Sequence, residues 1–260
     1  MSITVGLSGI AGWRALQNSE SRQIAAISAN SQVRSLIDYF RDNISSVASS
    51  DDIVGDYRLL KVALGAYGLE ADLPNKAFIR KVLESDIADD KSFVNRLSDK
   101  RYLRMARAFN LGGESWTAIS NATVDQVADS YIKRQYETRV GEGDESLRLA
   151  LNARRELESF VGRNSSDRTL WYEVLGNPPL RKVFEGAFGF GPAYGKLPVD
   201  RQLNEYMKAA DRFLGNTSFK TLSTDAGIDK VITNFLARSQ MMTGATGQNR
   251  YSAALALLSR

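Results

Sequence analysis

The chain has 260 residues, a formal net charge of +4, and neither cysteine nor histidine. Without thiolates and imidazoles it cannot form disulfides, Cys or His metal sites, or nucleophile–base pairs that need these residues. Its apolar content of 43% is ordinary for a globular protein, and no stretch approaches the roughly 20 apolar residues of a membrane-spanning helix. We therefore expect no membrane insertion, and the N-terminal sequence predicts no secretory signal peptide.

Residues 1–22 begin with Gly, Ser and small apolar residues, and we expect a flexible segment that becomes ordered when a partner binds. Trp13 and Leu16 lie in this segment. From residue 23 to about residue 46, apolar residues recur at spacings of three and four, which predicts an amphipathic helix. Asp51 and Asp52 follow two serines, a pattern typical of the start of a short helix.

The stretch Gly55–Leu69, GDYRLLKVALGAYGL, occurs again 121 residues later as GNPPLRKVFEGAFGF. Each copy predicts a helix that ends at a glycine able to adopt the left-handed backbone of a C-cap. Small residues before that glycine allow another helix to approach closely. We interpret the repeat as a determinant of the fold, with these residues in its two copies: Gly55, Leu59, Val62, Gly65, Ala66 and Gly68, then Gly176, Leu180, Val183, Gly186, Ala187 and Gly189.

Beyond the repeat, apolar residues recur at helical spacing in every segment bounded by turn or capping residues. No segment shows the alternation typical of a strand, so the predicted fold class is all-α. Residues 162–167, GRNSSD, are the best linker candidate by composition. The further predicted helices cover residues 76–84, 89–97, 98–109, 123–140, 147–161, 170–175, 203–213, 218–222, 228–242 and 250–258.

The chain contains a second internal similarity besides this repeat. Residues 131–151 resemble residues 235–255 at an offset of 104, which aligns Tyr131 with Phe235 and Arg134 with Arg238. We therefore predict an internal duplication with two related multi-helix halves, residues 23–161 and 168–260, packed as one compact unit.

The candidate chemical motifs favour structural interpretations. The glycines of the repeat follow a helix, whereas a phosphate-binding loop places them between a strand and a helix. The acidic segments at 51–52, 89–90 and 141–145 lack the ligand spacing of a calcium loop. Lys and Arg are interleaved with Asp and Glu, which is typical of a solvated surface. We assign no catalytic residue, cofactor, metal ligand or nucleic-acid partner; Ser/Lys and paired-carboxylate chemistry stay open, although no motif marks either.

The chain ends in the apolar sequence ALALL. The two ends are interpreted either as fraying tails or as elements that become ordered on a partner. On the second interpretation, the candidate partner-binding residues are Trp13, Leu16, Leu255 and Leu258.

The stretches LLKVALGAYGL, NKAFIRKVLE and LSDKRYLRMARAF follow an N-terminal AGWRALQ. This series resembles an uncharacterised family of helical alphaproteobacterial proteins that carry a domain of unknown function and are often encoded near flagellar genes. The resemblance extends over nearly the whole chain. It implies a flagellum-associated role and provides no catalytic residue to carry over.

The first functional hypothesis is therefore a non-enzymatic interaction protein, serving flagellar assembly or structure as a chaperone, scaffold or minor component. It predicts a flagellar or other assembly protein as partner, and a cytoplasmic location with flagellar export as the alternative. The other hypothesis is a small-molecule or lipid-binding protein with a pocket between the two halves, lined by residues such as Trp171, Tyr194 and Tyr206. The sequence leaves the oligomeric state open.

Overall fold

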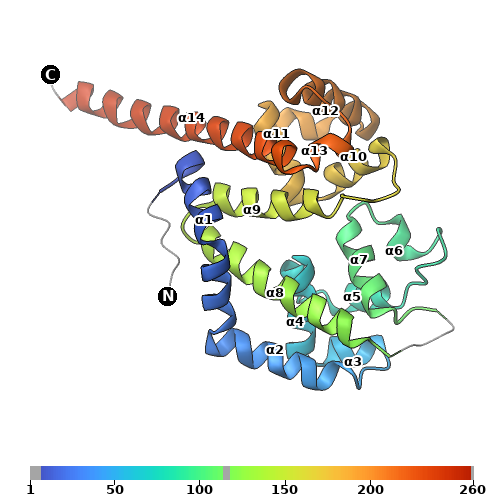
Figure 1. The fold of residues 1–260 in the computed structure, drawn as a ribbon. Helices are drawn as coiled ribbons and strands as arrows, with labels where there is room; N and C mark the ends of the chain where they lie inside the picture. Colours follow the sequence, from blue (N-terminus) through green and yellow to red (C-terminus); the bar gives the residue numbers. More distant parts are fainter. Residues whose placement is uncertain (1–6, 114–117, 259–260) are drawn as a thin grey trace. The chain divides into compact units, whose positions relative to one another are not determined.

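The computed structural model describes residues 7–113 and 118–258, and over residues 242–258 it describes the backbone alone. Within these ranges the regular structure is entirely helical, with no strand, so the predicted all-α class is confirmed (Figure 1). The chain forms two compact units. Unit 1 comprises the residues up to Asn18 together with those from Val140 onward, and unit 2 comprises Ser19–Arg139.

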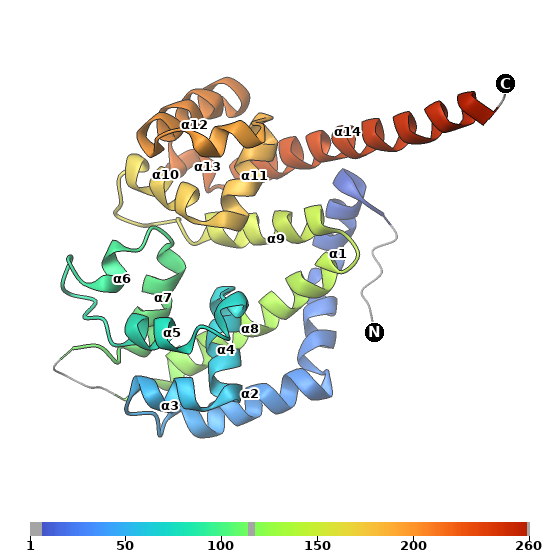
Figure 2. The ribbon, with the colours of Figure 1, turned by 180° about the vertical axis from the view of Figure 1, so that it is seen from behind.

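Unit 2 contains the first copy of the repeat. In it α2 packs against α4, and α5 packs against α7 (Figure 2). Its elements are α2 (Ser31–Ile44), α3 (Ser50–Gly55), α4 (Tyr57–Tyr67), the 3-10 helix η1 (Glu70–Asp72), α5 (Lys76–Leu83), α6 (Phe93–Arg96), α7 (Lys100–Phe109) and α8 (Asn121–Gly141), whose last residues pass into unit 1.

Unit 1 contains the second copy. Helix α11 packs against α9 and α14, and α12 packs against α10 and α11 (Figure 1). Its elements are α9 (Glu145–Glu158), α10 (Asp167–Gly176), α11 (Pro178–Phe188), the 3-10 helix η2 (Pro192–Lys196), α12 (Val199–Leu214), α13 (Phe219–Leu222) and α14 (Asp225–Leu258), together with the first turns of α1 (Gly9–Ser28).

The division into units falls elsewhere than the predicted halves. Helix α9 lies before the predicted linker at 162–167, yet it belongs to unit 1. The physical reason is packing, because α9 buries its apolar side against α11 and α14. A linker-like composition marked the loop after α9, but the units separate before that helix.

Side-chain caps start many of these helices, because the first N–H groups of a helix lack partners within it. Ser49 and Asp52 form a reciprocal capping box at α3, as the acidic pair after the serines suggested. Asp56 caps α4, and Asn177 caps α11 at the matching position of the repeat. Local sequence thus sets the start of the helix in both copies.

The N-terminal segment differs from the expectation of flexibility over residues 9–22. Helix α1 begins at Gly9, and the side chains of Trp13 and Leu16 are 2% and 0% exposed. The Trp13 indole N–H donates to Asp229 of α14 at 3.3 Å, and Leu147 of α9 lies close to Gly12. Burial of a large aromatic ring offsets the weak helix propensity of the Gly and Ser residues. Residues 1–6 lie outside the described residues.

Candidate functional site

The two copies of the repeat form helices of the same length with the same ending. Helices α4 and α11 both have 11 residues, and the glycines that follow them, Gly68 and Gly189, adopt left-handed φ values of +69° and +73°. The apolar residues of the motif are buried in both units: Leu59, Val62 and Ala66 in unit 2, and Leu180, Val183 and Ala187 in unit 1. The first glycine of each copy, Gly55 and Gly176, ends α3 and α10 respectively.

The mid-helix glycines of the repeat make room for an aromatic ring. A Cβ added to Gly65 would lie 2.6 Å from the ring of Tyr131 on α8, and one added to Gly186 would lie 2.6 Å from the ring of Phe235 on α14. Burial raises the pKa of Tyr131 to about 12, so its hydroxyl stays protonated at neutral pH. Tyr131 and Phe235 are the two residues aligned by the similarity between residues 131–151 and 235–255.

An arginine lies against each C-cap glycine. A Cβ on Gly68 would be 2.5 Å from the guanidinium of Arg134, and one on Gly189 would be 2.7 Å from that of Arg238. In unit 2 the guanidinium of Arg134 also donates to the carbonyl of Tyr67 at 3.1 Å, satisfying a carbonyl at the helix end. In unit 1 the guanidinium of Arg238 instead lies 5.0 Å over the ring of Phe213.

The motif residues therefore hold helices together and present no reactive group. The candidate partner-binding residues Trp13 and Leu16 lie in the interior of the protein, while the side chains of Leu255 and Leu258 lie outside the described residues. Trp171 and Tyr206, suggested as pocket-lining residues, are fully buried and in mutual ring contact. The ring of Tyr194 stacks on Phe190 with centroids 3.7 Å apart.

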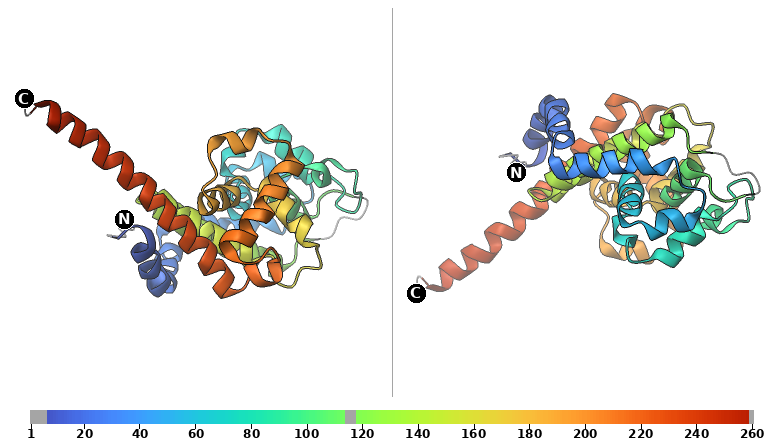
Figure 3. Two further views of the ribbon diagram at one scale, coloured as in Figure 1. Left: turned by 90° about the horizontal axis from the view of Figure 1, so that it is seen from above. Right: turned by 90° about the horizontal axis from the view of Figure 1, so that it is seen from below.

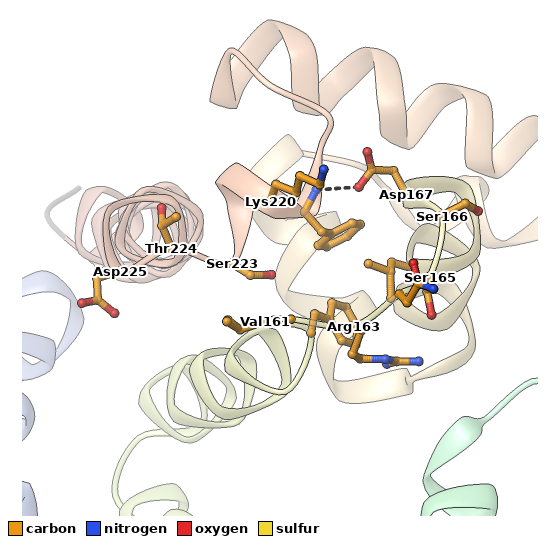
Figure 4. Close-up of a pocket in the computed structure, with 14 residues that line it drawn as sticks. Val161, Arg163, Ser165, Ser166, Asp167, Lys220, Ser223, Thr224 and Asp225 are labelled. Atoms are coloured by element: carbon orange, nitrogen blue, oxygen red, sulfur yellow. Dashed lines mark hydrogen bonds between the residues drawn. The ribbon is translucent and has the colours of Figure 1, made fainter.

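A cavity lies within unit 1 (Figure 4). It has a volume of about 810 Å³, within the range of small-molecule sites. Three elements bound it: the end of α9 with the loop that follows, the first turn of α10, and α13 with the start of α14. Its lining residues are Phe160, Val161, Gly162, Arg163, Asn164, Ser165, Ser166, Asp167, Leu170, Phe219, Lys220, Ser223, Thr224 and Asp225.

Most charged and capping groups around the cavity already have partners in the protein. Arg163 forms a two-pronged ion pair with Glu173, with N–O distances of 2.6 and 2.8 Å. Asp167 accepts the backbone N–H of Phe219 at 2.8 Å, a bond that joins α10 to α13. These contacts shape the cavity walls and leave few groups for a ligand.

Ser223 differs from these partnered residues of the cavity wall. Its side chain is 5% exposed, and its hydroxyl has no hydrogen-bond partner among the described residues. Figure 4 shows this hydroxyl pointing from the junction of α13 and α14 into the space bounded by the loop. An unpaired buried hydroxyl destabilises a fold, and this cost makes Ser223 a candidate for a functional contact.

The sequence did not predict this cavity, because its residues form no motif. The predicted linker at 162–167 supplies its loop wall, and α13, nearly 60 residues later, supplies the opposite wall. Only packing of α13 onto α10 and α14 brings the two together. Serines and a glycine in a loop are common enough that nothing in the sequence singled them out.

Over residues 7–113 and 118–258, no helix is both long and apolar enough to cross a bilayer. The described part of the chain also holds no cluster of three or more metal-ligating side chains.

One solved structure and one family model resemble this chain. A comparison with curated proteins finds no match. The structure resembles the crystal structure of Protein AGR_C_984 from Agrobacterium tumefaciens, with a TM-score of 0.75 and 27% sequence identity, covering 93% of this chain and 96% of that chain. Residues 66–228 match the model of DUF1217, described as a protein of unknown function. That match covers more than half of the sequence, from α4 of unit 2 to the start of α14 in unit 1. The chain therefore belongs to the DUF1217 family.

Proposed function

We propose that this chain is a non-enzymatic interaction protein of flagellar assembly or structure, acting as a chaperone, scaffold or minor component. The observation that carries the proposal is the length of α14 relative to its packing. The flagellar context comes from the resemblance of the motif series to proteins encoded near flagellar genes. The partner is a flagellar export or axial protein, and the site of action is the cytoplasm or, after flagellar export, the filament axis.

Helix α14 is 34 residues long, and the described side chains that it buries come from its first turns. These buried side chains lie where α14 packs against α9, α11 and α13. They are Ile228, Val231, Ile232, Phe235 and Leu236. Figure 3 shows the later turns of α14 continuing past these helices of unit 1. A stretch of helix that extends beyond the helices on which it packs is suited to pairing with another protein.

The sequence of that stretch has the spacing of a helix-pairing seam. Alternating steps of three and four residues connect Gly244, Gly247, Tyr251, Ala254 and Leu258. This is the a/d pattern by which two helices pack together. Two glycines each cost a helix about 1 kcal/mol relative to alanine, so packing on a partner helix would offset a real penalty.

The burial of Trp13 and Leu16 supports a binding element at the C-terminal end of the chain. The side chains of Trp13 and Leu16 are buried and are not accessible to a partner. Leu258 occupies a seam position, and Leu255 follows the seam residue Ala254. The C-terminal turns of α14 are therefore the proposed binding element.

The test is affinity capture from the bacterium that encodes the protein, followed by mass spectrometry. The double variant Leu255→Glu, Leu258→Glu places one charge at the proposed seam and one directly beside it. The control Ala256→Glu adds a charge on the opposite side of the helix by the heptad register. We expect flagellar export or axial proteins with the wild type and the control, and their loss with the double variant. Equal capture by all three baits, or capture of no flagellar protein, would contradict the proposal.

A second candidate function is small-molecule binding. One observation favours it, namely the 810 Å³ cavity of unit 1 with the unpaired hydroxyl of Ser223 in its wall. This cavity lies inside unit 1, at the predicted linker.

We also infer that the two units arose by internal duplication. The support is the matched set of contacts: Gly65 with Tyr131 and Gly186 with Phe235, Gly68 with Arg134 and Gly189 with Arg238. The N-caps Asp56 and Asn177 also occupy matching positions. On this view the first copy of the duplicated unit begins at α2 and the second copy begins at α9.

A further inference from the structure

Helices α2 and α9 hold corresponding places within the two units. Each has 14 residues, and each packs against the helix of the repeat, α2 on α4 and α9 on α11. Each also begins directly after a side-chain cap that accepts the N–H groups of the second and third residues. The cap is Asn30 at α2 and Asp144 at α9. The first residues of the two helices, Ser31 and Glu145, therefore correspond.

In unit 1 this first residue supplies a negative charge beside the repeat helix. The carboxylate of Glu145 accepts two hydrogen bonds from Arg148, at 2.6 and 2.7 Å. These hydrogen bonds lower the pKa of the Glu145 carboxyl, and the charge of Lys182, the fifth residue of α11, lowers it further. The protein itself thus places a carboxylate near the lysine of the repeat.

In unit 2 the corresponding lysine lies beside a serine instead. Lys61 is the fifth residue of α4, and it lines a cavity of about 520 Å³ together with Ser31. A second cation, Arg139 of α8, belongs to the same lining, which includes no Asp or Glu among the described residues. Lys61 and Arg139 form no ion pair with a residue that the structure describes. The cavity is therefore positively charged.

The cavity is a groove between α2, α4 and α8, which lie side by side in unit 2 (Figure 2). Tyr131, Gln135 and Arg139 line it at intervals of four residues along α8. Eight residues of helix extend about 12 Å, which is the length of about four residues of extended chain. A single phosphate or carboxylate would occupy a small part of this length. An extended peptide segment matches it.

Neutral polar side chains complete the groove. Gln32 and Ser35 of α2 and Gln135 of α8 line it between the two cations and the aromatic ring of Tyr131. A glutamine amide both donates and accepts, so it can pair with the N–H and C=O groups of a peptide backbone. The Asn30 cap already accepts the N–H groups of the first turn of α2, so side chains provide the recognition.

We propose that this groove binds an extended acidic segment of a partner protein. One carboxylate of the segment pairs with Lys61, as Glu145 does for Lys182 within unit 1. A second carboxylate, about three residues along the segment, pairs with Arg139. The inference concerns unit 2 alone and does not rest on the function proposed for α14.

The experiment is isothermal titration calorimetry on the full chain with an acetylated and amidated tetraglutamate peptide. The matching tetraglutamine peptide removes the charges, and glutarate and inorganic phosphate represent small anions. The variants are Lys61→Gln, Arg139→Gln and Ser31→Glu, the last of which gives α2 the acidic first residue of α9. The controls Lys133→Gln and Ala122→Glu make the same charge changes at exposed positions of α8 outside the lining.

We expect saturable binding of tetraglutamate that weakens as salt is added, and none of tetraglutamine. Lys61→Gln and Arg139→Gln should each weaken binding about three- to fivefold, as expected for the loss of one exposed ion pair. Ser31→Glu should weaken binding at least as much, because its carboxylate takes the place of the peptide's beside Lys61. An acid in the first turn favours the helix, so this variant should stay folded. The two controls should bind within about twofold of the wild type.

Other results overturn the inference in distinguishable ways. No saturable heat from tetraglutamate up to about 5 mM at low salt would refute binding of an acidic segment. Glutarate or phosphate binding as tight as that of tetraglutamate would assign the groove to a small anion. Peptide binding that survives Ser31→Glu and Lys61→Gln, or that the two controls weaken equally, would exclude this groove as the site.

Discussion

The ring of Tyr131 lies so close to Gly65 that a Cβ on the glycine would be 2.6 Å from the Tyr131 ring carbons. Tyr131 is buried and has little room to move. Gly65→Ala should therefore destabilise the protein by about 1–3 kcal/mol through overpacking, even though alanine is the better helix former. Urea unfolding monitored by circular dichroism measures this change.

The control for that substitution is Gly55→Ala, because a Cβ at Gly55 would have no neighbour within 4 Å. Its effect on stability should be within about 0.5 kcal/mol. If Gly65→Ala proved as mild as Gly55→Ala, the close approach of Tyr131 would not constrain the helix. Gly186→Ala, opposite Phe235, should repeat the result in unit 1.

Three of the glycines with positive φ, Gly68, Gly189 and Gly162, allow backbone strain and packing to be separated. Gly162 has a φ of +72° and would place no Cβ near another atom, so Gly162→Ala measures backbone strain alone, about 1–2 kcal/mol. Gly189→Ala should cost nearly the same, because the guanidinium of Arg238 ends a flexible side chain.

Gly68→Ala should cost more than either, because Arg134 is buried and is held by its hydrogen bond to the Tyr67 carbonyl. Thermal unfolding of the three variants gives the order directly. Equal losses at all three positions would show that the contact with Arg134 contributes nothing beyond strain.

Asn177 has two roles at the start of α11. Its side chain accepts the N–H of Leu180 at 3.4 Å and donates to the buried carboxylate of Glu156 at 3.0 Å. Asn177→Ala removes both a cap, worth about 1 kcal/mol, and a donor to a buried charge, worth about 1.5–3 kcal/mol. Ser166→Ala removes the exposed cap of α10 and an exposed bond to the Thr169 hydroxyl, but no contact with a buried charge, and it is the control. Chemical denaturation should show a clearly larger loss for Asn177→Ala; similar losses would mean that the bond to Glu156 is unimportant.

The capping box of α3 predicts a dependence on pH. The backbone N–H of Ala48, with the hydroxyl and N–H of Ser49, lowers the pKa of Asp52 below its ordinary 3.8. A lowered folded-state pKa means that the contribution is present above pH 3.8 and is lost as pH falls through the folded pKa. Asp52→Asn should therefore reduce stability at pH 7 and shrink the loss on acidification. The neighbouring Asp51→Asn serves as control, and an unchanged acid response of Asp52→Asn would refute the assignment.

The sequence predicted the features that depend on local chemistry. The all-α class followed from apolar spacing, and the left-handed helix ends at Gly68 and Gly189 followed from the position of each glycine. Their φ values of +69° and +73° agree with that prediction. The alignment of Tyr131 with Phe235 also identified two rings that contact equivalent glycines.

Features that depend on long-range packing were missed. Composition suggested a flexible N-terminus, but the ring of Trp13 is buried and its indole bonds to Asp229, 216 residues away. The boundary between units precedes α9 because that helix packs on α11 and α14, which no local pattern reveals. The cavity at Ser223 likewise requires α13 to meet a loop distant in sequence.

The most direct test of the proposed function is photo-crosslinking in the living bacterium. A photoreactive amino acid replaces Leu258 at the proposed seam, and in a matched strain it replaces Ala256 on the opposite side of the helix. We predict crosslinks from position 258 to a flagellar export or axial protein, and far fewer from position 256. Crosslinks from both positions at equal yield, or to no flagellar protein, would contradict the claim that the end of α14 binds a flagellar partner.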